Sequence, residues 1–399
     1  MSSKAIRLEI PGPKGNLLAA RLDLPTGTVR AYGLFAHCFT CGKDGHAARR
    51  IASALTEKGI AVVRFDFTGL GDSEGDFASS NFSSNIDDLV AIARFMANEG
   101  QAPALMIGHS LGGAAVLCAA GQLDFVKAVA TINAPANTGH LADLLTGMGD
   151  GKAPASINIG GRPFTITQQF LDDLAGRKVL DCAAELKKPL LILHAPRDTI
   201  VGIDHARQIF EQAKHPKSFV SLDESDHLLS DQKDTSYAAE IIAAWGSRFL
   251  PEQAREEGPG VGQVLVRETR LGNYQNHGLV RGHVVTIDEP PSHKGLDTGP
   301  TPIEFLSAAL GGCTSITLRM YADRKGWDVD GISVLIQQQK VEGIGTRFTR
   351  SIALDGTLDA AQRKRMLEIA DKCPVHKILE GNVEIITREM DQREMDKPE

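Results

Sequence analysis

The sequence contains few cysteines, no long apolar run and no excess of basic residues. Six cysteines are scattered over 399 residues. This is too sparse for a disulfide framework, so we expect free thiols in a reducing cytoplasm. No apolar run reaches membrane-spanning length, and the N-terminal residues lack the apolar core of a secretory signal. With 43 basic and 50 acidic residues, the net charge of −7 argues against nucleic-acid or anionic-membrane partners.

The length of the chain exceeds that of one ordinary core, so two domains are expected. Hydrophobic residues make up 42% and charged residues 23% of the sequence, which is typical of a soluble globular protein. Residues 251–261 carry charge, proline and glycine without apolar periodicity and are interpreted as a linker. This linker separates a first domain, residues 1–250, from a second domain, residues 262–399.

The first domain alternates between strand-like and helical patterns. After an expected N-terminal hairpin, apolar runs at 31–37, 61–65, 104–107, 128–132, 190–194 and 219–222 are separated by segments of helical periodicity. Buried strands separated by helices predict a doubly wound α/β sheet that is covered on both faces.

A glycine-rich turn, Gly-His-Ser-Leu-Gly-Gly over residues 108–113, follows the third of the parallel runs and opens a helix of small residues. Strand, Gly-x-Ser-x-Gly and helix in this order expose a serine hydroxyl above a sheet, and the tight turn excludes large side chains at the flanking positions. The start of the helix also directs free N–H groups at the site. Ser110 is therefore the candidate nucleophile.

Residues 1–250 resemble the α/β-hydrolase family, in which the catalytic acid and histidine follow the serine along the chain. Asp198 and His227 each come just after a predicted strand, where an open α/β sheet binds its ligands. The resemblance implies that His227 accepts the Ser110 proton while Asp198 orients and stabilises the imidazole.

An oxyanion hole requires two backbone donors. The N–H of Leu111 is the first. By resemblance the N–H of Phe39 is the second, although Cys38 stands where many relatives carry glycine. Cys38 and Cys41 form a Cys-x-x-Cys pair, but no second such pair or paired-histidine motif accompanies it. We therefore predict that the two side chains only pack within their loop, and we expect no metal or other cofactor.

The insertion at residues 133–182 contains glycine- and proline-rich loops and one expected helix near 166–175. Insertions of this kind are often lids. Because this one is short, we expect a small, open acyl pocket.

The second domain has a different order of elements. Strands are expected near 263–269, 279–287, 332–342 and 346–354, helices near 302–325 and 359–372, and a last strand at 383–387, which together predict an α+β fold. Cys313 lies in mid-helix beside two glycines, and Cys373 precedes a proline that favours the first position of a helix.

The stretches 299–314 and 372–377, which carry these cysteines, resemble the OsmC/Ohr family of dimeric thiol peroxidases. The resemblance implies that Cys313 is the peroxidatic thiol, that Cys373 resolves it, and that the chain forms a homodimer through this domain. The family's glutamate immediately after the proline is replaced by Ile303. Glu304, which follows, is a possible support for the thiol site, but nine helical residues turn through about 900°, so it would point away from Cys313.

The activating arginine expected from this resemblance is not assigned: Arg270 and Arg281 are both candidates by position. The first functional hypothesis is a serine hydrolase of small carboxylic esters fused to an OsmC-like thiol domain. A second is a thiol-dependent reductase of organic hydroperoxides, with an added thiol reductant, and a third gives the C-terminal domain only a dimerising role. The intact Ser110, His227 and Asp198 set favours the first.

Overall fold

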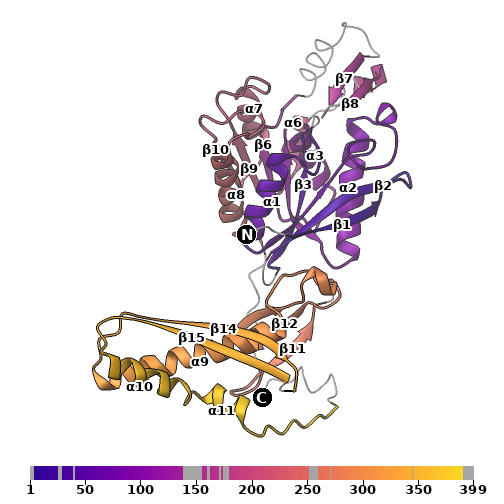
Figure 1. The fold of residues 1–399 in the computed structure, drawn as a ribbon. Helices are drawn as coiled ribbons and strands as arrows, with labels where there is room; N and C mark the ends of the chain where they lie inside the picture. The colour runs from indigo at the N-terminus through magenta and orange to yellow at the C-terminus, as the bar shows by residue number, and fades with distance from the viewer. Residues whose placement is uncertain are drawn as a thin grey trace. The chain divides into compact units, whose positions relative to one another are not determined.

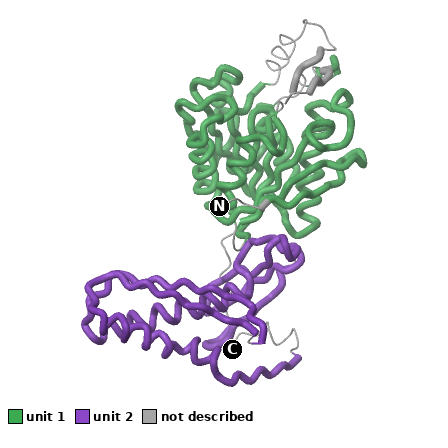
Figure 2. The backbone as a smooth tube through the Cα atoms, viewed as in Figure 1, with its two compact units in different colours: residues 1–257 green, residues 258–399 purple. Residues whose placement is uncertain are grey.

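The computed structural model describes residues 4–25, 29–38, 41–137, 155–159, 162–169, 172–173, 179–250, 259–269, 271–343 and 345–389. The chain divides into two compact units, residues 1–257 and 258–399, shown in green and purple in Figure 2. Each unit has its own secondary structure and its own core, and each is described separately below. None of the helices in the described ranges combines the length and the hydropathy that a bilayer crossing requires.

The first unit is built on an eight-stranded sheet of order β1-β2-β4-β3-β5-β6-β9-β10 (Figure 1). β1 and β2 form the expected hairpin, β2 pairs antiparallel with β4, and the remaining neighbours are parallel. The strands are β1 Lys4–Pro11, β2 Leu17–Leu24, β3 Ala31–Ala36, β4 Ile60–Phe65, β5 Pro103–His109, β6 Ala128–Ile132, β9 Leu190–His194 and β10 Lys217–Ser221. This sheet confirms the predicted α/β-hydrolase architecture.

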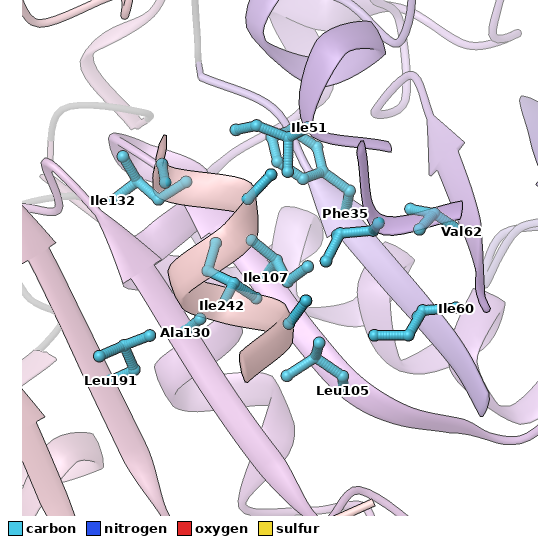
Figure 3. Packing of buried hydrophobic residues seen from close by; sticks show 14 of the residues in the cluster. Phe35, Ile51, Ile60, Val62, Leu105, Ile107, Ala130, Ile132, Leu191 and Ile242 are labelled. Atoms are coloured by element: carbon cyan, nitrogen blue, oxygen red, sulfur yellow. The ribbon is translucent and has the colours of Figure 1, made fainter. Parts of the chain in front are cut away.

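Helices pack against the sheet, and their buried side chains form the hydrophobic core together with those of the strands. Buried side chains of α1 and α8 meet those of the central strands, among them Phe35, Ile51, Ile107 and Ile242 (Figure 3). In a second group of helices, α3 contacts both α2 and α6. The helices of this unit are α1 His46–Thr56, α2 Phe82–Asn98, α3 Leu111–Ala120, α6 Val179–Glu185, α7 Asp204–Gln212, α8 Gln232–Gly246 and the short 3-10 helix Phe77–Ser79.

The turn between β5 and α3 places Ser110 in a left-handed conformation, with φ 55°. The glycines on either side permit this turn because any Cβ would clash. A Cβ on Gly108 would lie 2.3 Å from the Gly112 carbonyl oxygen, and one on Gly112 would lie 2.4 Å from the His37 carbonyl oxygen. The nucleophile turn is therefore packed against the end of β3, as well as against its own strand.

Part of the insertion between β6 and β9 lies outside the described residues, including 138–154 and much of the helix expected near 166–175. The described part contains two short antiparallel strands, β7 Ala155–Ile159 and β8 Arg162–Ile166, which the sequence did not predict.

The second unit separates strands from helices, as an α+β fold does. Its strands form a three-stranded antiparallel sheet, β11-β12-β13, and a two-stranded ribbon, β14-β15. α9 packs on β14, and α10 and α11 pack on α9. The elements are β11 Leu265–Glu268, β12 Asn276–Val280, β13 His283–Ile287, the 3-10 helix Pro291–His293, α9 Pro302–Lys325, β14 Gly331–Val341, β15 Gly345–Asp355, α10 Ala360–Ala370 and α11 Pro374–Glu380.

Two expectations for this unit were wrong. The single strand expected near 279–287 is the hairpin of β12 and β13, because Arg281 and Gly282 both have positive φ and form the two-residue turn. The last strand expected at 383–387 does not form, and Val383, Ile385 and Ile386 are exposed by 60%, 86% and 67%. Their β-branched pattern predicts a strand, but the described chain offers no neighbouring strand to pair with this segment.

Candidate active site

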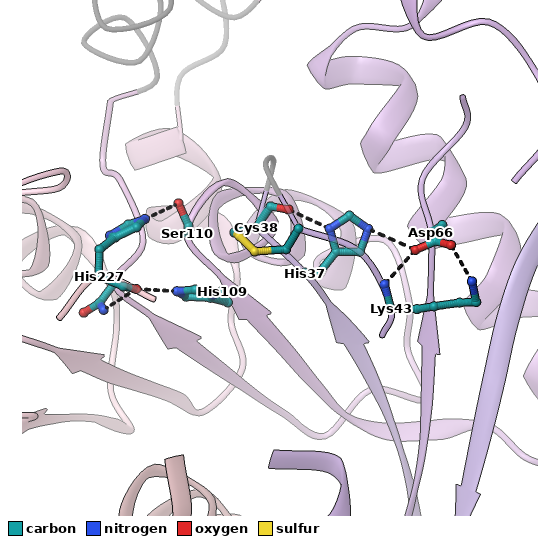
Figure 4. Close-up of a disulfide and its surroundings, with 9 residues drawn as sticks. His37, Cys38, Lys43, Asp66, His109, Ser110 and His227 are labelled. Atoms are coloured by element: carbon teal, nitrogen blue, oxygen red, sulfur yellow. Dashed lines mark hydrogen bonds and ion pairs between the residues drawn. A yellow bond between two sulfur atoms is a disulfide. The ribbon is translucent and has the colours of Figure 1, made fainter. Parts of the chain in front are cut away.

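Ser110, His227 and Asp198 lie together at the carboxyl ends of the parallel strands, as the sequence predicted. The Nε2 atom of His227 is 2.9 Å from Ser110 Oγ, and its Nδ1 is 2.6 Å from Asp198 Oδ2. All three side chains are largely buried, and Ser110 points toward His227 (Figure 4). The geometry suits proton transfer from the serine to the imidazole.

Asp198 is held by its own loop as well as by His227. Its Oδ1 accepts hydrogen bonds from the backbone N–H groups of Ile200 and Val201, at 2.8 and 2.9 Å. Burial alone raises the pKa of the Asp198 carboxyl. The hydrogen bonds from His227, Val201 and Ile200 outweigh burial, so the net pKa lies below its usual value. Asp198 is therefore anionic at neutral pH and keeps a proton on His227 Nδ1.

Two residues that sequence analysis did not assign hold the backbone of His227. Its carbonyl oxygen accepts a hydrogen bond from His109 Nε2, at 2.7 Å, and another from Asn133 Nδ2, at 3.0 Å. Burial, together with a smaller contribution from the neighbouring His227, lowers the pKa of His109 to about 4. His109 is thus neutral, with its proton on Nε2. It fixes the loop that carries His227.

The two expected oxyanion donors have different outcomes. Leu111 is the first residue of α3, so its N–H has no partner within the helix and lies next to Ser110. Phe39 lies outside the described residues. The assignment of its N–H therefore stays a prediction.

In the second unit, Cys313 and Cys373 come together although 60 positions separate them. Both are free thiols, and a hydrogen bond links their side chains. Cys373 is fully buried and caps α11, as expected, with its Sγ 3.3 Å from the His376 backbone nitrogen. Cys313 is partly exposed.

Burial raises the pKa of the Cys373 thiol, but hydrogen bonds from His376, Thr314 and Cys313 and the charge of Arg350 outweigh it. The net pKa lies below its usual value. Thr314 Oγ1 lies 3.7 Å from the sulfur and receives a hydrogen bond from Arg350 Nη1 at 3.0 Å.

Arg350, which projects from β15, is held in place by the residues before Cys373. It donates to the Ala370 carbonyl oxygen at 2.9 Å and to Asp371 Oδ1 at 2.6 Å. Of the two arginines considered from the sequence, Arg270 lies outside the described residues and Arg281 forms the turn between β12 and β13, whereas the charge that acts on Cys373 is that of Arg350.

Glu304 does not support the thiol site. Its carboxylate accepts the N–H of Thr301 at 2.7 Å, and its own N–H donates to the Thr301 hydroxyl, so the two residues form the capping box that starts α9. The glycines before Cys313 also differ in role. Gly311 packs against Ile336 of β14, whereas nothing lies within 4 Å of where a Gly312 Cβ would be.

Comparison with known proteins assigns both units. The model of the serine aminopeptidase S33 family matches residues 38–141, and the model of OsmC-like proteins matches residues 294–388. The esterase domain of a Rhodothermus marinus protein is 45% identical, with a TM-score of 0.52, over 62% of this chain and all of that domain. The chain is an α/β hydrolase fused to an OsmC-like domain. The first unit is called the hydrolase domain below, and the second the OsmC-like domain.

Other relatives are more distant. The mouse palmitoyl-protein thioesterase ABHD10 is 26% identical over 240 residues, which are 57% of this chain and 76% of that protein. YfhR of Escherichia coli O157:H7 is 21% identical over 196 residues, 48% of this chain, and the match spans only 62% of YfhR. Est1E of Butyrivibrio proteoclasticus, with bound ferulic acid, has a TM-score of 0.53 at 22% identity over 61% of this chain and 99% of its own, which shows the fold alone.

The expectation of free thiols was wrong for the hydrolase domain, which contains two disulfides. Cys38 pairs with Cys41 and Cys118 pairs with Cys182, with Cα atoms 5.3 and 5.0 Å apart. The second bond joins α3 to α6 across 64 positions of the chain, so only the folded structure brings its cysteines together.

In Figure 4 the disulfide at Cys38 lies between Ser110 and His227 on one side and the charged residues Lys43 and Asp66 on the other. Asp66 accepts the Lys43 backbone N–H and the Lys43 ammonium, each at 2.6 Å, and the ammonium also reaches Asp72 at 2.6 Å. Burial lowers the pKa of Lys43, but its hydrogen bonds to Asp66 and Asp72 raise it above the usual value. A Cβ on Gly71 would lie 2.1 Å from Asp66 Oδ2, so only glycine fits beside this carboxylate.

The functional residues that sequence analysis missed have weak local signals. His109 lies inside the nucleophile motif, where its position before Ser110 carries no role in the general pattern. Asn133 follows an apolar strand and has a positive φ of 47°, a conformation in which asparagine is enriched. Arg350 is one of several charged residues on an alternating strand, and its contact with Thr314 depends on the packing of β15 near α9.

Proposed function

We propose that the protein is a serine hydrolase that cleaves small carboxylic esters, with thioesters as related substrates. The observation that carries the proposal is the pair of hydrogen bonds that joins Ser110 to His227 and His227 to Asp198. The Rhodothermus marinus esterase domain and the ABHD10 thioesterase support the same class of acyl transfer.

The proposed reaction begins when Ser110 Oγ attacks the acyl carbon and its proton passes to His227 Nε2. Asp198, which accepts from Nδ1, stabilises the imidazolium that forms. The N–H groups of Leu111 and Phe39 are the proposed donors to the tetrahedral oxyanion. His227 then returns the proton to the leaving alcohol, and water repeats the sequence to release the acid.

The test is the hydrolysis of p-nitrophenyl esters by the wild-type protein and by two variants, one without the Ser110 hydroxyl and one without the Cys313 thiol. We expect Ser110→Ala to lower kcat by several orders of magnitude, because triad residues act as a unit, and Cys313→Ser to leave it unchanged. In an acyl-length series, acetate and butyrate should be cleaved faster than palmitate. Full activity in Ser110→Ala would remove the triad from the mechanism, and a maximum at palmitate would contradict the small pocket.

A second activity is favoured by the contact between Cys313 and Cys373. We propose that the OsmC-like domain reduces organic hydroperoxides. The Cys313 thiolate attacks the peroxide oxygen and releases an alcohol, and the resulting sulfenic acid condenses with Cys373 to a disulfide and water. An added thiol reductant restores both thiols. The lowered pKa of Cys373 favours this condensation, because the resolving thiol attacks as a thiolate.

The proposal extends to assembly and location. We infer a homodimer formed through the OsmC-like domain, supported by the exposed apolar side chains of Ile316, Met320 and Leu335. A cytoplasmic location is part of the proposal, because the thiol cycle of Cys313 and Cys373 needs a pool of reductant. The alternative in which this domain only dimerises the chain predicts that both thiols stay reduced under hydroperoxide.

A further inference from the structure

The Cys38–Cys41 disulfide lies at the wall of a cleft beside the triad. The cleft has a volume of about 650 Å³ and is lined by both cysteines and by His109 and Leu228, the neighbours of Ser110 and His227. Cys38 is 2% exposed, whereas Cys41 is partly exposed. A small molecule that enters this cleft therefore has access to the Cys41 end of the bond.

The chain on the Cys38 side of the disulfide contacts the nucleophile turn. His37 precedes Cys38, and its ring Nδ1 donates to the Cys38 carbonyl oxygen at 2.6 Å. The His37 carbonyl oxygen would be only 2.4 Å from a Cβ on Gly112, which lies in the first turn of α3 after Ser110. A shift of the backbone at Cys38 is thus transmitted to the helix start that presents Ser110 and Leu111.

The chain on the Cys41 side is fixed by charge. Lys43, two residues later, binds Asp66 through its backbone N–H and its ammonium, and a Cβ on Gly42 would lie 3.0 Å from Asp66 Oδ1. Both ends of the segment are therefore anchored, at α3 and at Asp66. Between these two anchors, Cys38 and Cys41 are joined by the disulfide and by the hydrogen bond from the Cys41 N–H to the Cys38 carbonyl oxygen, at 3.1 Å.

We propose that Cys38–Cys41 is a redox-active disulfide that small thiols open and that sets the esterase activity of the hydrolase domain. The closed form keeps His37 against Gly112 and Lys43 on Asp66, and the opened form loosens these contacts and hydrolyses esters more slowly. This inference rests on the proposed esterase function. It makes the wall of this cleft beside Ser110 and His227 a second site for thiol chemistry, in a different domain from Cys313 and Cys373.

The exchange is balanced with two equivalents of thiol. A thiolate attacks Cys41 Sγ, the bond to Cys38 breaks, and the electron pair leaves on Cys38 as a thiolate. A second thiolate attacks the outer sulfur of the mixed disulfide and releases Cys41, while solvent protons complete the two cysteine thiols. The protein disulfide is reduced, and the two small thiols are oxidised to their own disulfide. An excess of small-molecule disulfide reverses both steps.

The experiment uses the full-length protein equilibrated with reduced or oxidised dithiothreitol and then desalted without oxygen. Hydrolysis of p-nitrophenyl acetate and alkylation of Cys38 and Cys41, read by peptide mass spectrometry, are measured on the same samples. We expect kcat to fall at least about tenfold as the pair becomes reduced, since misplacement of catalytic groups by about 1 Å can cost about a hundredfold. Re-oxidation should restore it.

A double variant and a matched control separate this disulfide from the other one. Cys38→Ser/Cys41→Ser should be weakly active and insensitive to dithiothreitol, with an unchanged circular dichroism spectrum. Cys118→Ser/Cys182→Ser should keep the full response to dithiothreitol.

Unchanged kcat in samples whose Cys38 and Cys41 are alkylated would overturn the proposal, as would a pair that resists dithiothreitol or a fully active Cys38→Ser/Cys41→Ser variant. An oxidised wild-type protein without esterase activity would instead count against the proposed function. The alkylation pattern would then still decide whether the pair exchanges with thiols.

Discussion

The two domains differ in how much apolar surface each one buries. In the hydrolase domain, a continuous cluster joins the central strands to α1 and α8, and Phe35, Ile51 and Ile242 are almost completely buried. In the OsmC-like domain, the buried cluster is much smaller and comprises Leu318, Ala322, Val329, Met366, Ile369 and Ala370. Several large apolar side chains of that domain remain more than half exposed, including Ile316, Met320 and Leu335.

We infer from this difference that the hydrolase domain is self-contained, whereas the OsmC-like domain is completed by a second copy of the chain. A domain with a small core gains little stability from burial alone. Exposed apolar groups of this size mark surfaces that bind other molecules. The triad is accordingly complete within one chain, while the thiol site belongs to a domain that we expect to be completed by a second copy. Four predictions test this contrast.

The largest effect is expected for Asp198→Asn, which should abolish most esterase activity and leave the thiol domain untouched. The variant loses the carboxylate that fixes the His227 tautomer, so kcat/KM should fall by about 10³–10⁴. The measurement is steady-state hydrolysis of p-nitrophenyl acetate. Asp226→Asn, on the same loop as His227, is the matched control and should stay within a few-fold of wild type. Equal losses in both variants would indicate loop damage instead of a catalytic role.

The next effect concerns the thiol site. Arg350→Gln removes a positive charge beside Cys373 and the donor to Thr314, so the pKa of Cys373 should rise. A rise of one unit reduces the thiolate fraction about tenfold and should slow formation of the Cys313–Cys373 disulfide to the same extent. Mass spectrometry after addition of cumene hydroperoxide follows the disulfide.

Arg347→Gln, on the same strand and exposed, is the control for this variant. Cys373→Ser should trap a sulfenic acid at Cys313. If both thiols stay reduced in the wild-type protein under hydroperoxide, the domain has no peroxidase chemistry and the dimerising role is the surviving hypothesis.

A change in oligomeric state, from dimer to monomer, is expected when the domains are separated. The fragment 1–257 should be a monomer that retains esterase activity, because its core and triad are complete. The full-length chain should be a dimer in light scattering at micromolar concentration. A full-length monomer would contradict the inferred role of the exposed apolar side chains, and an inactive fragment would contradict the independence of the hydrolase domain.

The smallest effect is a change in how stability depends on pH. Burial lowers the pKa of His109 from 6.5 to about 4, so the unfolded chain binds more protons between these values and stability falls as pH falls. Burial raises the pKa of Asp88 from 3.8 to about 6, so the folded chain binds more protons and stability falls as pH rises through that window.

His109→Gln and Asp88→Asn should therefore change the slope of stability against pH in opposite directions. Each slope should change by about 1.4 kcal/mol per pH unit at most, the value for one proton. Urea unfolding of the fragment 1–257 at pH 4.5, 5.25 and 6 measures both slopes. The fluorescence of Trp245, the only tryptophan of this fragment, follows the unfolding. Slopes that change in the same direction would mean that a group other than these two dominates.

Local sequence patterns predicted most of the hydrolase fold and its triad. The nucleophile turn at Ser110, the strand ends before Asp198 and His227, and the helix cap at Cys373 each carry their signal within a few residues. Arg350 and the Cys118–Cys182 bond depend on segments that meet only after folding, so no local pattern marks them. The segment 383–387 shows that a local pattern can also predict too much: its β-propensity favours a strand, but propensity does not supply the neighbouring strand with which it would pair.

Asn133 limits which sequences can preserve this site. Its backbone has a positive φ, its amide nitrogen donates to the His227 carbonyl oxygen, and its amide oxygen accepts the Ala195 N–H at 2.9 Å. Glycine meets the first requirement and loses both hydrogen bonds, aspartate loses the donor, and glutamine is one methylene too long for a side chain with no exposed surface. The position directly after β6 therefore accepts almost no side chain other than asparagine if the contacts to both His227 and Ala195 are to be kept.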